Sequence, residues 1–232
     1  MLLSGSNDHN IKLWDTKSGT LLRTFSEHIT ITRDVIFTPD EKSVVSAEGN
    51  YLVYWADAVS GFIGHLTMHG HTDIVTSIDM DSEMNKIISA SRDSTIKIWD
   101  AESGNLIQSI NAHNGSVLDL KMNPASKQFA SCGDDSTIKI WDLNTFSLIK
   151  TLKKDMKKVN SISYHNSGEY LACGGDKNNI YIWDLKSDSV IISLEGHSNV
   201  VNAVEFSSAG DDLISGGVDE KVIIWRNVFL KK

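Results

Sequence analysis

Serine, histidine and aspartate recur together in this chain, in the combination that carries out nucleophilic catalysis in many hydrolases. Each set places the serine 18 residues after the histidine and the aspartate 4 residues after the serine. The three sets are His71, Ser89 and Asp93; His113, Ser131 and Asp135; and His197, Ser215 and Asp219. A hydrolase needs one such site, so three copies at constant spacing indicate a structural network. We therefore predict no catalytic residue and no enzymatic activity.

Six tryptophans define the period of the repetition. They are Trp14, Trp55, Trp99, Trp141, Trp183 and Trp225, separated by 41, 44, 42, 42 and 42 residues. Apolar residues alternate before them, as in Ile96-Lys97-Ile98-Trp99, and this alternation with β-branched residues indicates a strand. The pattern divides a single domain of residues 1–232 into a partial repeat at about 1–27 and repeats at 28–70, 71–112, 113–154, 155–196 and 197–232.

A histidine, a strand, Ser-x-x-x-Asp, a second strand and Trp-Asp at a period near 42 residues resemble the WD-repeat family, and the resemblance covers residues 1–226. It implies an all-β fold, the WD-repeat β-propeller, in which each repeat supplies a four-stranded blade. One blade cannot bury both of its faces, so neighbouring blades must stack. We expect five complete four-stranded blades plus one incomplete blade, in an open or truncated ring.

The resemblance also implies a structural role for the polar sets. Each set joins a tryptophan, so the expected tetrads end in Trp99, Trp141 and Trp225. The indole N–H donates to the serine, the serine donates to the histidine, and the histidine bonds the aspartate. The fifth repeat has Asp155, Cys173 and Lys177 at these positions. Two alternatives follow: Asp155 pairs with Lys177, or both side chains face solvent and Asp176 takes the turn role.

Three positions per repeat line the partner-binding face in proteins that this chain resembles. Two follow the histidine position by three and five residues, and one precedes the turn aspartate. The predicted protein-binding residues are Arg33, Glu48, Thr76, Arg92, Leu118, Asp134, Lys158, Asn160, Asp176 and Asn202. The further positions of the same kind hold Asn7, Ile31, Ile74, Ser116, Val200 and Val218. This mixture of apolar, basic and acidic groups suits a peptide of mixed character rather than a phosphate backbone.

The two ends of the repeat pattern do not complete a ring by counting. Seven residues follow Trp225, and the histidine that would partner Ser4 falls before Met1. Three explanations remain open: the chain is part of a longer polypeptide, the propeller is open or distorted with six blades, or a second chain adds the missing strand and completes the ring.

Composition excludes several classes of protein. The net charge of −8 argues against direct nucleic-acid binding, and no apolar run reaches the roughly 18 residues of a membrane helix, so we expect no membrane association. The N-terminus has no signal-peptide pattern. Cys132 and Cys173 fall in predicted strands as buried thiols, which fits a reducing, cytoplasmic compartment.

Two local clusters of like residues, one of histidines and one of lysines, could suggest binding sites. His65, His69 and His71 lack an accompanying cysteine or acidic cluster, so we predict no metal site and no cofactor. The basic run at residues 153–158 is a solvated loop or a contact for an acidic partner segment.

We expect a scaffold that binds protein partners of unidentified nature and assembles a cytoplasmic or cytoskeletal complex. The alternative is a propeller subunit of an RNA-processing or chromatin complex. The run Ser215-Gly216-Gly217-Val218-Asp219, with Trp225 and Phe229, also resembles the last repeat of centriole and basal-body WD proteins. That resemblance adds the cytoskeleton, the cilium and the basal body to the expected locations.

Overall fold

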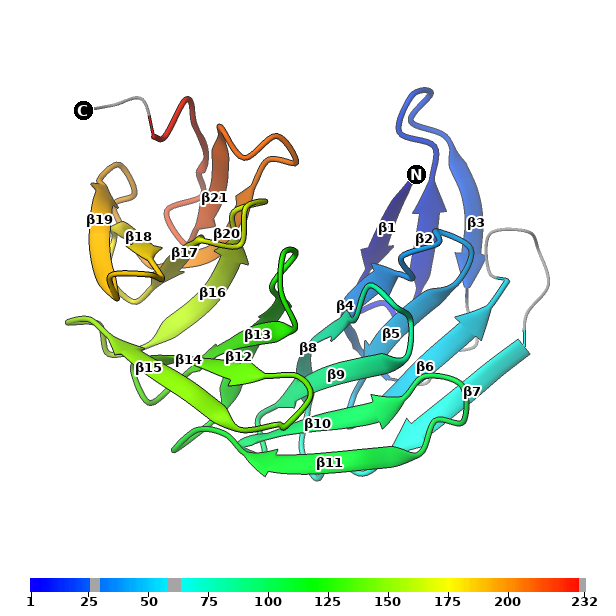
Figure 1. Cartoon of the computed structure of the whole chain (residues 1–232). Coiled ribbons are helices and arrows are strands. Elements are labelled where there is room, and N and C mark those ends of the chain that lie inside the picture. Colours follow the sequence, from blue (N-terminus) through cyan, green and yellow to red (C-terminus); the bar gives the residue numbers. More distant parts are fainter. Residues whose placement is uncertain (26–29, 58–63, 230–232) are drawn as a thin grey trace. The chain divides into compact units, whose positions relative to one another are not determined.

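The computed structural model describes residues 1–25, 30–57 and 64–229, and every regular element in them is a β-strand. The chain divides into two compact units, Met1–Ala112 and His113–Lys232. Within each unit, antiparallel strands that are consecutive in sequence lie next to each other in a sheet (Figure 1). None of the described residues forms a helix that could span a membrane. The predicted all-β class is confirmed.

The first unit contains one three-stranded and two four-stranded sheets. The first sheet consists of β1 (Leu2–Gly5), β2 (Ile11–Trp14) and β3 (Leu21–Phe25). The second consists of β4 (Thr32–Phe37), β5 (Val44–Glu48), β6 (Tyr51–Ala56) and β7 (Gly64–His69). The third consists of β8 (Val75–Met80), β9 (Lys86–Ser91), β10 (Thr95–Asp100) and β11 (Leu106–Asn111).

The second unit contains two four-stranded sheets and one three-stranded sheet. The fourth sheet consists of β12 (Val117–Met122), β13 (Gln128–Gly133), β14 (Thr137–Asp142) and β15 (Leu148–Lys153). The fifth consists of β16 (Val159–Tyr164), β17 (Tyr170–Gly175), β18 (Ile180–Asp184) and β19 (Ser189–Leu194). The sixth consists of β20 (Val201–Phe206), β21 (Leu213–Gly217) and β22 (Val222–Trp225).

The expectation of five complete blades was wrong by one, because the sixth sheet has three strands in the described residues. In the fourth repeat, Asp142 accepts backbone hydrogen bonds from Asn144 and Thr145 and so folds the turn that leads to β15. Arg226 occupies the matching position and has no carboxylate to fold that turn. The chain instead places Val228, 1% exposed, in the core of the fifth and sixth sheets.

The core lies between consecutive sheets of the same unit. In the second unit, Ala130, Ile138 and Ile140 of the fourth sheet join Ile162, Leu171 and Trp183 of the fifth sheet in one cluster. The second sheet is the middle sheet of the first unit and has a neighbour on both faces, which is why all the residues from Val44 to Glu48 of β5 are buried. Burial on both faces requires the stacked arrangement that the repeat pattern predicts.

Candidate protein-binding face

A β-bulge recurs in the innermost strand of five sheets, and it positions the candidate binding residues. The register shifts between Thr32 and Asp34 in β4, and at the matching place in β8, β12, β16 and β20. The residues left out of the ladders are Arg33, Thr76, Leu118, Asn160 and Asn202. A bulge re-aims a side chain and is common at functional sites. These five are the predicted residues that follow the histidine position by five.

The residue after the bulge of β4, β12 and β16 ties its sheet to the next one in the same unit. Asp34 accepts hydrogen bonds from the Ile78 N–H at 2.9 Å and from the Ser77 hydroxyl at 3.1 Å. In the second unit, Asp119 accepts from the Ile162 N–H at 2.9 Å, and the Ser161 hydroxyl accepts from the Val204 N–H at 3.2 Å. Sequence reasoning missed these links, although polar residues at this position recur at the repeat period and were a usable signal.

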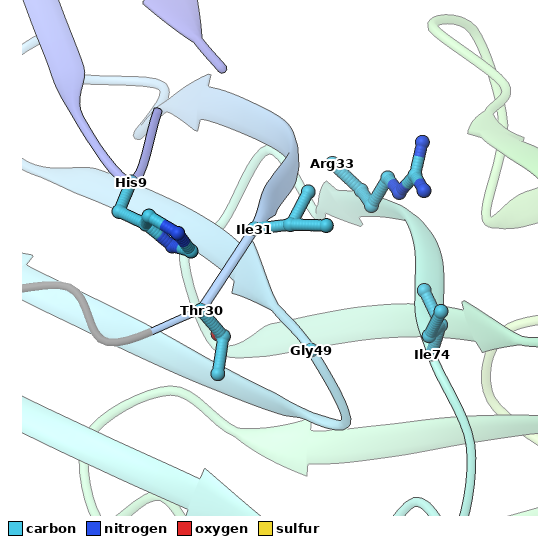
Figure 2. A pocket seen from close by; sticks show the side chains of 6 residues that line it. All are labelled: His9, Thr30, Ile31, Arg33, Gly49 and Ile74. Atoms are coloured by element: carbon cyan, nitrogen blue, oxygen red, sulfur yellow. The ribbon is translucent and has the colours of Figure 1, made fainter. Parts of the chain in front are cut away.

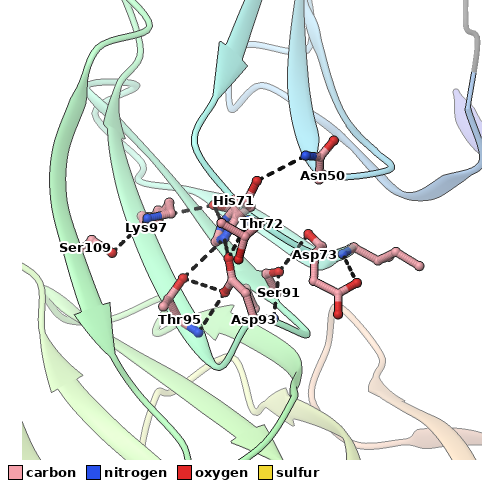
Figure 3. Close-up of polar contacts among 12 residues, drawn as sticks. Asn50, His71, Thr72, Asp73, Ser91, Asp93, Thr95, Lys97 and Ser109 are labelled. Atoms are coloured by element: carbon pink, nitrogen blue, oxygen red, sulfur yellow. Dashed lines mark hydrogen bonds and ion pairs between the residues drawn. The ribbon is translucent and has the colours of Figure 1, made fainter.

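The polar set of the third repeat forms one continuous chain of hydrogen bonds. Figure 3 shows its part around His71, Asp93 and Thr95. The Trp99 indole N–H donates to Ser89 Oγ at 2.9 Å, and Ser89 Oγ lies 2.8 Å from His71 Nε2. His71 Nδ1 lies 2.8 Å from Asp93 Oδ2. Asp93 also accepts from the Thr95 hydroxyl at 2.6 Å and from the Thr72 N–H at 3.0 Å.

The protonation states follow from burial and from these bonds. Burial lowers the pKa of His71, although Asp93 opposes the shift. Burial disfavours the charged form of Asp93, but its Thr95, Thr72 and His71 partners hold its pKa at about 2. His71 is therefore neutral: its Nδ1–H donates a hydrogen bond to the charged Asp93, and its Nε2 accepts a hydrogen bond from the Ser89 hydroxyl. Ser89 is 0% exposed, which keeps its hydroxyl away from any substrate.

The same arrangement occurs twice in the second unit. Ser131 accepts from Trp141 at 2.9 Å, and His113 lies 2.8 Å from both Ser131 and Asp135. The sixth sheet has the equivalent bonds at 2.8, 2.8 and 2.9 Å, which join Trp225, Ser215, His197 and Asp219. Each chain of bonds connects the loop before the innermost strand to the two middle strands.

Glu48 replaces part of this network in the second repeat. Ser46 accepts from the Trp55 indole at 3.1 Å and donates to Glu48 Oε1 at 2.6 Å. Glu48 is 2% exposed, so its assignment to the protein-binding face was wrong. Its carboxylate is buried inside the sheet, where it accepts the hydrogen bond from Ser46. His28, the expected histidine of this repeat, lies outside the described residues.

The fifth repeat replaces the network with apolar packing, and of the two alternatives for Asp155 and Lys177 the ion pair was wrong. Both side chains are exposed, and no ion pair within 4.0 Å joins them in the described residues. Gly175, Gly133 and Gly217 occupy equivalent positions in the fifth, fourth and sixth sheets. A Cβ built on Gly175 would lie 2.7 Å from Cε of Met156. A Cβ built on Gly133 or Gly217 would instead meet the ring of His113 or His197. Met156, 5% exposed, therefore fills the place of the histidine ring.

Two consequences follow from that replacement. Asp176 takes the turn role, because its carboxylate accepts from the backbone N–H groups of Lys157 at 2.9 Å and Lys158 at 3.3 Å. The Trp183 indole N–H is buried without a hydrogen-bond acceptor in the described residues. It faces the Cys173 thiol, whose pKa burial raises to about 12. The sequence signal for Met156 was an apolar residue at a position that is Thr, Asn or Ser in the tetrad repeats.

The remaining predicted face residues differ in their solvent exposure and in whether their side chains already make polar contacts. In the first unit, Arg33 and Arg92 are exposed, and the Thr76 hydroxyl donates to the Ala90 carbonyl. In the second unit, Lys158 pairs with Asp134 at 3.0 Å across the fourth and fifth sheets. Burial opposes ionisation of Asp134, but Lys158 and Ser116 lower its pKa. Asn160 donates to the Val201 carbonyl at 3.0 Å, Leu118 is half-buried, and Asn202 is exposed.

The two exposed histidines near His71 pack against rings. His65 lies 5.7 Å from the Trp55 ring, and His69 lies 5.2 Å from the Tyr51 ring. In the part of the chain that the structure describes, no group of three His, Cys, Asp or Glu side chains is arranged to hold a metal ion.

A pocket of about 310 Å³ opens among the loops of the first unit (Figure 2). His9 comes from the β1–β2 turn, Gly49 from the β5–β6 turn and Ile74 from the segment before β8. Thr30, Ile31 and Arg33 complete the lining around the start of β4. Figure 2 shows the Arg33 side chain extending on the same side as Ile74. The pocket thus contains three of the expected face positions.

Comparison with known proteins defines the family. The profile of the family described as WD domain, G-beta repeat, matches residues 1–15, 64–100, 104–142, 146–184 and 188–226, and the chain belongs to this family. The fold class is therefore the all-β WD-repeat β-propeller. The unmatched residues 16–63 contain most of the second repeat, in which Glu48 and Ala56 depart from the pattern.

Three relatives show the range of similar proteins. Autophagy-related protein 16 of Arabidopsis thaliana is 39% identical over 105 residues, which cover 44% of this chain and 20% of the relative. The WD repeat domain-containing protein 83 homolog of Dictyostelium discoideum is 33% identical over 98 residues, 42% of this chain and 30% of the relative. Nuclear distribution protein nudF of Aspergillus oryzae is 31% identical over 105 residues, 44% of this chain and 23% of the relative. The chain thus aligns with less than a third of each relative.

Proposed function

We propose that this chain is a non-enzymatic scaffold that binds peptides or protein domains on its bulged loop face and assembles a cytoplasmic or cytoskeletal complex. WD-repeat proteins generally act as protein-interaction scaffolds. The observation that carries the proposal is the repeated bulge, because it presents side chains of four types from the same position of five sheets. Variable side chains on a rigid frame suit recognition of a specific partner.

The names of the relatives support the proposed location. One is an autophagy-related protein and another is a nuclear distribution protein, and neither name describes an enzyme. We place the chain in the cytoplasm or on the cytoskeleton, with the cilium or basal body as a narrower proposal from the last repeat. We further propose that residues 1–232 constitute one domain. Completion of the ring by a second chain stays one of the three explanations for the incomplete repeat pattern.

Affinity purification tests the scaffold. The tagged chain should retain protein partners from its source cell, and the double variant Arg33→Ala, Arg92→Ala should lose at least one of them. Lys17→Ala combined with Lys42→Ala is the control, because these exposed lysines lie in the β2–β3 and β4–β5 connections at the opposite strand ends. Identical partners in both preparations would contradict the arginine assignment.

Nuclease treatment separates the alternative function. A subunit that reaches its partners through RNA or DNA should lose them on nuclease digestion and at raised salt. The proposed scaffold should keep its partners after digestion, and their loss would favour an RNA-processing or chromatin complex.

A further inference from the structure

We propose that the pocket of the first unit binds a short linear peptide in which an aliphatic or aromatic residue is followed by an aspartate or glutamate. The inference rests on the proposed scaffold function and names the ligand class of one part of its face. The apolar side chain would enter between Ile31 and Ile74, and the carboxylate would pair with Arg33. Each of these two contacts follows from separate observations.

The pocket accepts an apolar side chain because of its lining and size. Ile31 and Ile74 contribute apolar surface, and Thr30 and His9 close the sides. A volume of about 310 Å³ is at the small end of ligand pockets, so it suits one or two side chains of a peptide. Aliphatic and aromatic anchors that fill such pockets supply much of the binding energy at protein interfaces.

Backbone hydrogen bonds fix the pocket before any ligand arrives. The Gly49 N–H donates to the Ile31 carbonyl at 3.2 Å, and the Val75 N–H donates to the Gly49 carbonyl at 2.7 Å. Gly49 has a positive φ of 54°, and a Cβ added there would lie 3.3 Å from Thr30 Oγ1. Loops of neighbouring sheets are therefore joined at this glycine. A preformed site binds with a smaller entropic penalty than a flexible one.

The charge at the rim selects the neighbouring residue of the peptide. Arg33 is exposed and lies at the bulge of β4, and it has no acidic partner in the described residues. Asp73, the acidic residue beside Ile74, is turned back to accept the Ile74 N–H at 2.6 Å. Arg92 stands next to the pocket, because its N–H donates to the Ile74 carbonyl at 2.9 Å. Guanidinium groups bind carboxylates through paired hydrogen bonds, so an acidic residue is the complementary neighbour.

A fluorescence binding assay on the intact chain tests both contacts. The probes are labelled Gly/Ser peptides that contain Leu-Glu, Leu-Gln, Ala-Glu or Leu-Lys at the centre. The Leu-Glu peptide should bind about tenfold more tightly than Leu-Gln or Ala-Glu. Arg33→Gln should remove the preference for glutamate, and Ile74→Ala should weaken the Leu-Glu peptide several-fold. Unchanged thermal melts would show that both variants are folded.

Charge exchange gives the decisive comparison. Arg33→Glu should reject the Leu-Glu peptide and bind the Leu-Lys peptide, whereas Lys17→Glu, a control at the opposite strand ends, should change neither. Equal binding of all four peptides, or failure of every peptide to bind, would overturn the inference. Tighter binding of a Leu-phosphoserine peptide than of Leu-Glu would overturn the carboxylate assignment.

Partner capture distinguishes this inference from the scaffold itself. If partners depend on Asn202 and Leu118 but not on Arg33 and Ile74, the scaffold stands and the pocket inference fails. If partners depend on none of these four residues, both fail.

Discussion

Individual side chains in the tetrads matter because each hydrogen-bond donor is matched to an acceptor inside the sheet. His113 is 6% exposed and bridges Ser131 and Asp135, so its loss would leave a buried hydroxyl and a carboxylate without their partner. Unsatisfied buried groups cost more than the net value of the bond that is lost. The tetrads are thus a source of stability that a catalytic reading of the same residues would miss.

Replacing His113 by alanine tests that account. We expect His113→Ala to lower the free energy of unfolding by about 1–3 kcal/mol. Asn144→Ala is the matched control, because this exposed residue of the same repeat donates to Asp142 through its backbone N–H. Urea denaturation measures both variants, and equal stability of the two would contradict the network.

The same tetrads give the chain a defined dependence on pH. The pKa of His71 and of His113 is lowered by burial, so the unfolded chain binds protons before the folded one as the pH falls below about 6.5. This part of the stability is fully present above pH 6.5 and decreases below it. Burial opposes ionisation of Asp93 and Asp135, but their hydrogen bonds hold each pKa at about 2. Their contribution is present above about pH 4 and is lost between about pH 4 and 2.

Denaturation with urea at pH 7, 6 and 5 checks the histidine step. The free energy of unfolding should decrease over this range, and His113→Asn, which does not titrate, should show a smaller decrease. A stability that is constant from pH 7 to 5 would exclude neutral buried histidines.

At the scale of the element, the fifth sheet shows that a blade can exchange its polar network for packing. Met156, Cys173 and Trp183 belong to the same core cluster as residues of the fourth sheet. Asp176 holds the loop that an aspartate one position later holds in the tetrad sheets. The replacement is coordinated, because removal of the histidine alone would leave a cavity.

Substitutions in the fifth repeat distinguish packing from an ion pair. Met156→Ala should destabilise the chain by about 2–4 kcal/mol, because it empties the place of the histidine ring. Asp155→Ala and Lys177→Ala should each change stability by less than about 0.5 kcal/mol, because both side chains are exposed. Thermal or urea denaturation provides the comparison. A larger effect for Asp155→Ala than for Met156→Ala would restore the ion-pair hypothesis.

At the scale of the whole molecule, one repeat position has different environments in different sheets. Ile140 of the fourth sheet is 1% exposed, whereas Ile224 at the equivalent position of the sixth sheet is 50% exposed. Val222 is 75% exposed, although its counterpart Ile138 is 3% exposed. The sequence pattern is the same at both places, so the presence of a packed neighbour decides what each residue contributes.

Paired substitutions measure that difference. Ile140→Thr should cost about 2–4 kcal/mol, because it places a hydroxyl in the core and removes apolar contacts. Ile224→Thr should cost less than about 1 kcal/mol, because half of its side chain is already in solvent. Equal losses in denaturation experiments would show that Ile224 is packed in solution.

The sequence by itself determined the strands, the repeats and the tetrads, because all three depend on local or periodic patterns. The spacing of His113, Ser131 and Trp141 specifies which strands must meet, and the alternation before each tryptophan specifies which faces are apolar. The bulges occur at the predicted face residues five positions after the histidine position, because the strand register is the same in these five repeats.

Only the tertiary structure decided the cases in which side chains from different strands compete for one space. Glu48 was expected at the surface but accepts a hydrogen bond from the buried Ser46 hydroxyl, and Met156 fills a site that the repeat spacing had assigned to Asp155. The joining of Ile31, Gly49 and Ile74 into one pocket brings together loops of neighbouring sheets. Such contacts depend on the positions of atoms that are distant in sequence, and residue spacing contains no information about which of two neighbouring side chains fits the available volume.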